Sequence, residues 1–313
     1  MDILLISTSF ILSFIIIIFS QKYFLHNNYI DKINNRSSHS SLATRSGGIS
    51  IFLTLFLISA YFYLTGYDIY EFSILIPLSI LATVGLYDDI HGVDFKLKFI
   101  FQIIAAKIII DNGLIIDNLH GFGGLYEISR ITAQLITVLV IVAIINSINF
   151  IDGIDGLAIT IVILFIIGFE FFAIPPTSYT NLSTILIASL APLFYFNFRK
   201  KNKVFLGDSG SLFLGAIVSV YVIRILTQDY IIKPEYDLHK VLFVVSILFY
   251  PIIDIIRIFF LRLIKGKSPF QPDKNHIHHL ILSKTKSHFK TTFFIILVNI
   301  IIIFTFQLIQ DFQ

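Results

Sequence analysis

Four short polar segments interrupt a strongly apolar sequence, and their residue types could hold a divalent cation and bind phosphates. They read GLYDD at 85–89, NSINFIDGIDG at 146–156, FLGDSGS at 205–211 and HIHH at 276–279. Carboxylate and amide oxygens are hard ligands that suit Mg²⁺. Because acids are costly to bury at a membrane boundary, their presence there indicates a function.

The segment at 146–156 combines two amides with two carboxylates. Asn149 and Asp152 stand three residues apart, so a helix would place their oxygens one turn apart. The glycines after Asp152 and Asp155 permit close backbone turns. The alternative is that Asp155 caps the next helix. A cap accounts for one acid and for neither amide, so we favour a functional segment.

Acids in two other segments adjoin the ends of apolar stretches. Asp208 stands at the start of a predicted helix, where anions are favoured and where an acid can hold the metal that accompanies them. Asp88 and Asp89 follow one apolar stretch, and Lys96 and Lys98 open the next, so acid and base could meet across a short loop. The alternative for this pair is a solvated helix end.

Three imidazoles, those of His276, His278 and His279, are concentrated in one predicted loop. Zinc is the first alternative, because histidine suits it. The chain has no cysteine and offers oxygen ligands elsewhere, so we favour contacts with phosphates. The sequence contains neither GxxxxGK[ST] nor GxGxxG, so neither a P-loop nor a dinucleotide-binding domain is indicated.

The elements that must position these segments are predicted to be membrane helices. The 313 residues are 56% hydrophobic and 14% charged, with a mean hydropathy of +0.86. This composition indicates an all-α polytopic membrane protein, with 1–313 forming a single domain. A small outer hairpin is expected where 114–119 and 125–128 flank a glycine-rich turn. About ten transmembrane helices are expected, at 2–20, 48–65, 71–87, 95–111, 130–147, 156–173, 180–197, 209–226, 240–262 and 291–309.

An alternating path through these spans places all four polar segments on one face. Most of the 23 Lys and Arg residues also fall on that face. By the positive-inside rule this face is cytoplasmic and both termini are outside. The basic face suits anionic headgroups or phosphates in the bilayer rather than nucleic acid.

Taken in order, the polar segments resemble those of the polyprenyl-phosphate N-acetylhexosamine-1-phosphate transferases, glycosyltransferase family 4. The HIHH form is similar to the branch that initiates O-antigen, common-antigen or teichoic-acid glycans. The family often has Pro-Thr-Pro-Arg-Gly-Gly-Gly at 42–48 and proline where Ile33 stands, so the loop shape is expected to differ there. The resemblance spans nearly the whole chain and rests on Arg36-Ser-Ser-His39, Thr44-Arg45-Ser-Gly47-Gly48, Asp88-Asp89 through Lys98 and Gln102, NSINFIDGIDGLA, FLGDSGSLFLG and SPFQPDKNHIHH.

The resemblance implies a bacterial inner-membrane enzyme with a cytoplasmic Mg²⁺ site, where Mn²⁺ could substitute. It implies a fold of ten or eleven helices, and a homodimer is a further expectation. Asp208 and Asn149 match metal ligands. The acids expected to matter for catalysis are Asp88, Asp89, Asp152 and Asp155. The residues expected to bind substrate are Arg45, Lys98, Asn146, His276, His278 and His279.

The implied reaction joins a UDP-sugar to a polyprenyl phosphate such as undecaprenyl phosphate. The lipid phosphate attacks the β-phosphorus, and UMP leaves. UDP-GlcNAc is the predicted donor, with a UDP-6-deoxy-N-acetylhexosamine or UDP-MurNAc-pentapeptide as alternatives. A phosphomonoester with a second pKa of about 6 is largely dianionic at neutral pH, so direct transfer is favoured over an aspartyl intermediate.

Two other classes of membrane protein are alternatives. A transporter or channel would carry its acids near mid-span, along a conduction path. The acids here lie at span ends on one face, which favours chemistry on a membrane-anchored substrate. A lipid phosphatase would give the paired amides and acids no obvious role.

Overall fold

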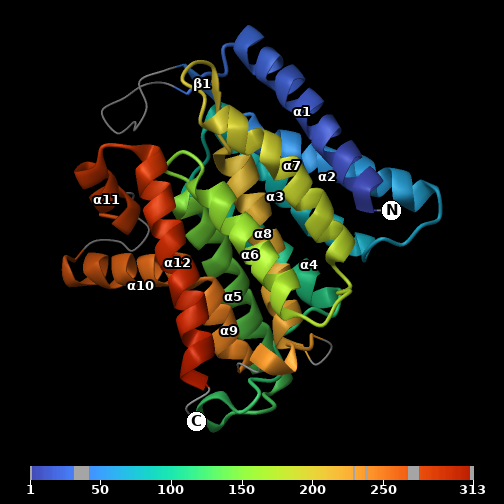
Figure 1. The fold of residues 1–313 in the computed structure, drawn as a ribbon, viewed down its shortest axis with the longest axis vertical. Helices are drawn as coiled ribbons and strands as arrows, with labels where there is room; N and C mark the ends of the chain where they lie inside the picture. Colours follow the sequence, from blue (N-terminus) through green and yellow to red (C-terminus); the bar gives the residue numbers. More distant parts are fainter. Residues whose placement is uncertain (1, 32–41, 228–229, 237–238, 267–274, 311–313) are drawn as a thin grey trace.

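The computed structural model describes residues 2–31, 42–227, 230–236, 239–266 and 275–310. Almost all of its regular structure is helical, which confirms the all-α prediction (Figure 1). The helices are α1 Asp2–His26, α2 Gly47–Leu64, α3 Leu75–His91, α4 Phe95–Asp111, α5 Arg130–Ile151, α6 Leu157–Phe172, α7 Thr180–Asn197, α8 Gly207–Leu226, α9 Lys240–Ile247, α10 Phe249–Ile264, α11 Ile277–Thr285 and α12 His288–Gln310.

Each predicted span corresponds to helix in the structure, but the count of ten is not confirmed. Within the described ranges, six helices are long and apolar enough to cross a membrane: α1, α2, α3 together with the 3-10 turn before it (Phe72–His91), α5, α8 and α12. The pair α9 and α10 would make a seventh if counted together. The helices α4 and α6 have only 17 and 16 residues. The chain is therefore a multi-pass membrane protein with at least these apolar helices.

The prediction of one continuous span over 240–262 is wrong in its shape. The helix breaks after Ile247, and α9 and α10 meet at 81°. Pro251 lacks the N–H that would bond to the carbonyl of Ile247, so one hydrogen bond of a continuous helix is missing here, which favours the break. The N–H of Tyr250 instead donates to Asn299 Oδ1 of α12 at 3.2 Å. The break turns α10 sideways from the helix bundle (Figure 1).

The helix α8 lies at the centre, packed between α3, α5 and α2. Nearly all of its residues are buried, as expected for a helix that is apolar on every side. Glycines bring its neighbours close. A Cβ on Gly210 would lie 2.7 Å from Gly48 Cα of α2, and one on Gly85 of α3 would lie 2.5 Å from Ser209 Cα. Backbone contacts between helices therefore hold the start of α8.

Two small strands, β1 Ala43–Thr44 and β2 Lys203–Val204, form a parallel ladder that the sequence analysis did not predict. The ladder joins the segment before α2 to the segment before α8. At the opposite end of the bundle lies the predicted hairpin, with an antiparallel bridge between Asn118 and Glu127 (Figure 1). The prediction of a hairpin is confirmed, although its two sides are joined by a single bridge and not by longer strands.

Candidate active site

Lys98 joins two acids from different polar segments. Its Nζ lies 2.9 Å from Asp88 Oδ2, at the end of α3, and 2.7 Å from Asp208 Oδ2, in the first turn of α8. Lys98 itself stands in the first turn of α4. Three helices thus converge on one charge cluster. The predicted meeting of acid and base is confirmed, and it includes a third partner, Asp208.

Asn149 approaches the same cluster from the last turn of α5. Its Nδ2 donates to Ser211 Oγ at 2.8 Å and lies 3.3 Å from Asp208 Oδ1. Its Oδ1 accepts none of the hydrogen bonds found among the described residues. One turn earlier, Asn146 Nδ2 donates to Gln102 Oε1 of α4 at 2.7 Å. The two amides of this segment therefore link α5 to α8 and to α4.

Asp89 has a different environment from its neighbour Asp88. Its two carboxylate oxygens accept the backbone N–H groups of Asp208, at 2.8 Å, and Ser209, at 2.9 Å. These are N–H groups of the first turn of α8, which have no partner within the helix. Gly207 adopts a φ of +73°, and a Cβ there would meet the Asp89 carboxylate at 2.7 Å. Asp89 therefore caps α8 from α3 and orients Asp208.

A cavity of about 520 Å³ opens beside the cluster. It is lined by side chains from the first half of α4, from the last turns of α5 and α10, and from the start of α11. The lining consists of Val93, Asp94, Phe95, Lys98, Gln102, Asn146, Asn149, Phe150, Asp152, Gly153, Leu212, Arg262, His276 and His279. Cationic, amide and carboxyl groups thus face one space that is large enough for part of a sugar nucleotide.

Asp152 follows α5 and faces the cavity. Burial and the negative charges of Asp208 and Asp89 raise its pKa well above the ordinary value of 3.8. The positive charge of Arg45, which pairs with Asp31 at 2.7 Å, acts to lower the pKa of Asp152. Burial opposes its charge, but attraction to Asp31, Asp89 and Asp208 outweighs burial and raises the pKa of Arg45. Arg45 therefore offsets part of the negative charge near Asp208.

Asp155, the last of the predicted catalytic acids, has two basic partners of its own. Within the described chain it is outside the cavity lining, and it pairs with Lys203 of β2 and with His288 of α12. Burial opposes its ionisation, but hydrogen bonds with His288 and Lys203 lower the pKa of Asp155. The alternative that Asp155 caps α6 is wrong, since Gly156 occupies that position without a side-chain cap. Asp155 ties its loop to β2 and α12.

The three predicted histidines have two kinds of surroundings. His276 and His279 line the cavity. His278 is fully buried, with Nδ1 2.9 Å from Tyr250 Oη. Burial, together with the neighbouring His279, lowers the pKa of His278 to about 3. Gly153 packs against this pair, because a Cβ there would lie 3.3 Å from His278 Nε2.

Arg262 and Phe150 also line the cavity, and neither is among the site residues predicted from the sequence. Arg262, near the end of α10, is 3% exposed, and its guanidinium lies 5.9 Å from the centre of the Phe150 ring. A charged residue in an apolar helix was the available signal, but it was assigned to the basic face alone. The predictions for Arg36, His39 and the segment 268–273 lie outside the described residues.

The oxygen donors near Asp208 fit a hard divalent cation. Asp208 supplies a carboxylate, and Asn149 has an amide oxygen without a partner among the described residues. Asp88 supplies a second carboxylate on the other side of Lys98. Such oxygens suit Mg²⁺, which keeps water or phosphate oxygens in its remaining positions.

Comparisons with known proteins identify the family. The model for "Glycosyl transferase family 4" matches residues 71–226. An undecaprenyl-phosphate alpha-N-acetylglucosaminyl 1-phosphate transferase of Pasteurella multocida is 33% identical over 88% of this chain and 77% of its own. The chain belongs to glycosyl transferase family 4. The resemblance to polyprenyl-phosphate N-acetylhexosamine-1-phosphate transferases is thereby confirmed.

Two further relatives extend the similarity to other bacteria. A probable undecaprenyl-phosphate N-acetylglucosaminyl 1-phosphate transferase of Bacillus subtilis is 30% identical, covering 87% of this chain and 75% of its own. A decaprenyl-phosphate N-acetylglucosaminephosphotransferase of Mycobacterium leprae is 29% identical, covering 81% and 70%. The family match includes the acids of α3 and α8 and the two acids that follow α5, Asp152 and Asp155, whereas Arg45 and the histidines lie outside its range.

Proposed function

We propose that this protein transfers N-acetylglucosamine-1-phosphate from UDP-GlcNAc to a polyprenyl phosphate, such as undecaprenyl phosphate, and releases UMP. The reaction would initiate a cell-envelope glycan at the bacterial inner membrane. The carrying observation is the cavity beside Asp208, which joins cation-binding oxygens to cationic side chains at the ends of apolar helices. The names of the relatives support the same acceptor and sugar.

The residues of the cavity divide between the metal and the phosphates. Asp208 and Asn149 would hold Mg²⁺, which when bound offsets charge on the diphosphate and on the transferring phosphoryl group. Lys98 and Arg262 would contact phosphate oxygens, since both present N–H donors and positive charge toward the cavity. Asp152 and Asp88 would position the acceptor phosphate beside them.

The chemical step is a direct exchange at one phosphorus atom. An oxygen of the lipid phosphate forms a bond to the β-phosphorus, which carries the sugar. The bond from that phosphorus to the bridging oxygen breaks, and UMP leaves with this oxygen and its electron pair. Lys98, between Asp88 and Asp208, would counter the charge of both reactants.

The central test is turnover by purified protein with Mg²⁺, undecaprenyl phosphate and UDP-GlcNAc. Asp208→Asn should lower the rate by about 100-fold or more, because it removes charge from the proposed metal site. Asp111→Asn is the matched control, since Asp111 is an exposed acid paired with Lys107 at the far end of α4. Undiminished turnover by folded Asp208→Asn protein, or in excess EDTA, would contradict the metal assignment.

Donor choice is tested by competition between sugar nucleotides. We expect UDP-GlcNAc to be used in preference to UDP-6-deoxy-N-acetylhexosamines and to UDP-MurNAc-pentapeptide. A clear preference for either competitor would reject N-acetylglucosamine while leaving the reaction class intact.

The direct route is tested by isotope exchange without lipid. Carrier-free enzyme is mixed with Mg²⁺, UDP-GlcNAc and radiolabelled UMP. In a direct transfer no label enters the UDP-sugar, because UMP leaves only when the acceptor attacks. Lipid-independent exchange would instead reveal a covalent sugar-phosphate intermediate on an enzyme carboxylate.

The proposed orientation places the cavity in the cytoplasm and both termini outside. The chain has no cysteine, so single cysteines can be introduced without background. Asn202→Cys, next to β2, should resist an impermeant reagent added outside, and Asn118→Cys, in the hairpin, should react. Labelling of Asn202→Cys and protection of Asn118→Cys would show that the orientation is the opposite one.

A further inference from the structure

We propose that Asp254 is a positioning residue that holds His276 with its Nε2 toward the phosphates of the sugar nucleotide. The inference rests on the proposed function, and it adds a residue that none of the four polar segments contains. Asp254 lies in α10, and His276 immediately precedes α11. The two side chains therefore join α10 to the start of α11.

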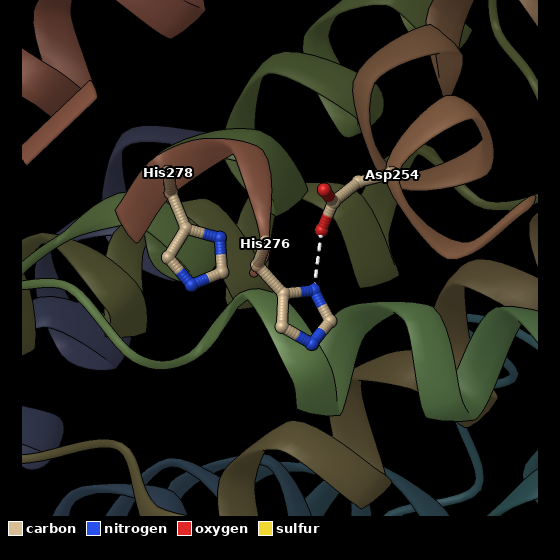
Figure 2. A group of neighbouring side chains, drawn as sticks. All are labelled: Asp254, His276 and His278. Carbon is tan, nitrogen blue, oxygen red and sulfur yellow. Dashed lines mark hydrogen bonds and ion pairs between the residues drawn. The ribbon is translucent and has the colours of Figure 1, made fainter. Parts of the chain in front are cut away.

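The contact between the two side chains is short and buried. His276 Nδ1 lies 2.6 Å from Asp254 Oδ2, and Asp254 is 1% exposed. Figure 2 shows that the other ring nitrogen of His276 points away from Asp254. Since a carboxylate accepts hydrogen bonds, Nδ1 carries the proton of this contact. Nε2 is thus the nitrogen that remains for the cavity, which His276 lines.

The second oxygen of Asp254 holds the backbone at the same place. The N–H of Ile277 donates to Asp254 Oδ1 at 2.8 Å. The start of α11 has no side-chain cap from His276, so Asp254 supplies the missing acceptor from a neighbouring helix. Both the ring and the backbone of His276 are thereby fixed relative to α10. The ring also lies 5.7 Å from the Phe150 ring of the cavity wall.

Asp254, His276 and His278 could in principle form a metal site, because a ligand atom from each lies within 4.8 Å of the others. Hydrogen bonds account for the cluster without a metal. His276 Nδ1 bonds to Asp254, and His278 Nδ1 is 2.9 Å from Tyr250 Oη. The nitrogen that has no hydrogen-bond partner among the described residues, His278 Nε2, lies beside Gly153. We therefore interpret the cluster as a support for His276.

The support has a chemical consequence at Nε2. A carboxylate on Nδ1 fixes the orientation of an imidazole, and the Nε2–H of a doubly protonated ring can donate to an anion. In the cavity, the anion of suitable chemistry is a phosphate oxygen of the sugar nucleotide. Arg262 and Lys98 line the same cavity. His276 would then complete a set of donors around the phosphates.

A double-mutant cycle tests the inference with kcat and KM for UDP-GlcNAc as readouts. Asp254→Ala and His276→Ala should each lower kcat/KM by about 10- to 100-fold, as loss of an orienting partner does. If Asp254 acts through His276, the double variant should be within about threefold of His276→Ala, because the second change removes nothing further. If the loss of kcat/KM in the double variant is instead the product of the two single losses, the proposal is overturned. Absence of turnover in the wild type would instead reject the proposed function.

Two isosteric variants separate positioning from folding. In His276→Asn, the amide nitrogen can occupy the place of Nδ1 and keep the bond to Asp254, while Nε2 is lost. We expect wild-type thermal stability in detergent with the low activity of His276→Ala. In Asp254→Asn, one amide oxygen cannot serve both Nδ1 and the Ile277 N–H, so kcat/KM should fall as in Asp254→Ala. Wild-type activity in either variant would refute the role of the pair.

Discussion

Replacement of Gly85 by alanine should inactivate the enzyme by displacing Asp208. The substitution adds a methyl group to α3 and leaves every side chain of the charge cluster unchanged. Gly85 lies in α3, one turn before Asp88, and faces the start of α8. A Cβ at this position would lie 2.5 Å from Ser209 Cα, whereas an ordinary contact begins at 3.4 Å. One helix must therefore retreat by about 1 Å. Because both sides of the contact are backbone, no side-chain rotation can relieve it.

The expected magnitudes differ for stability and for activity. Alanine favours a helix over glycine by about 1 kcal/mol, and overpacking costs about 1–3 kcal/mol, so the net loss of stability is at most about 2 kcal/mol. A shift of about 1 Å at a reacting centre can lower the rate by about 100-fold. The shift would separate Asp208 from Lys98 or Asn149. Gly85→Ala should therefore remain folded and be nearly inactive.

Gly168→Ala is the matched control, because Gly168 is also a helical glycine with a close neighbour. Its added Cβ would meet Ile247 Cδ1 at 2.8 Å, and this flexible side-chain tip can move aside. The assay compares initial rates of lipid-linked sugar formation with thermal stability in detergent. A wild-type rate for Gly85→Ala, or equal inactivation by Gly168→Ala, would refute the reasoning.

Three further predictions concern pH, a buried ion pair and phosphate binding. Burial lowers the pKa of His278 from 6.5 to about 3, so between these values the unfolded chain binds a proton that the folded chain does not. The free energy of unfolding should therefore fall by about 1.4 kcal/mol per pH unit as pH falls below about 6.5. The melting temperature of His278→Asn should fall less steeply than that of the wild type between pH 6.5 and 4.5. Equal slopes for the two proteins would contradict this. Lys203→Met should lower stability by about 1–3 kcal/mol, because it removes one of the two basic partners of the buried Asp155 carboxylate and leaves only His288, and adding Asp155→Leu should restore part of the loss in a thermal melt. Arg262→Lys should raise KM for UDP-GlcNAc by about 10-fold, since lysine cannot reproduce bidentate contact with phosphate; an unchanged KM would remove Arg262 from the phosphate site.

The amino-acid sequence determined the parts of this protein that depend on local composition. Apolar length located the helices, and the family resemblance of the polar segments at their ends predicted that Asp88, Asn149 and Asp208 share one site. Turn residues identified the hairpin at 114–128. These features could be predicted because hydropathy and turn preference are properties of adjacent residues. The order of the motifs also indicated the family.

The tertiary structure alone decided which partner each acid takes. Asp89 caps α8, a helix that begins more than 100 residues later, whereas its neighbour Asp88 pairs with Lys98. Asp155 pairs with Lys203 and His288. Such pairings depend on which helix ends meet and on how closely glycines let them approach, and neither distance nor direction is encoded in the spacing of residues along one segment. Pro251 was visible in the sequence, but the bond from Tyr250 to α12 that stabilises the break required the folded chain.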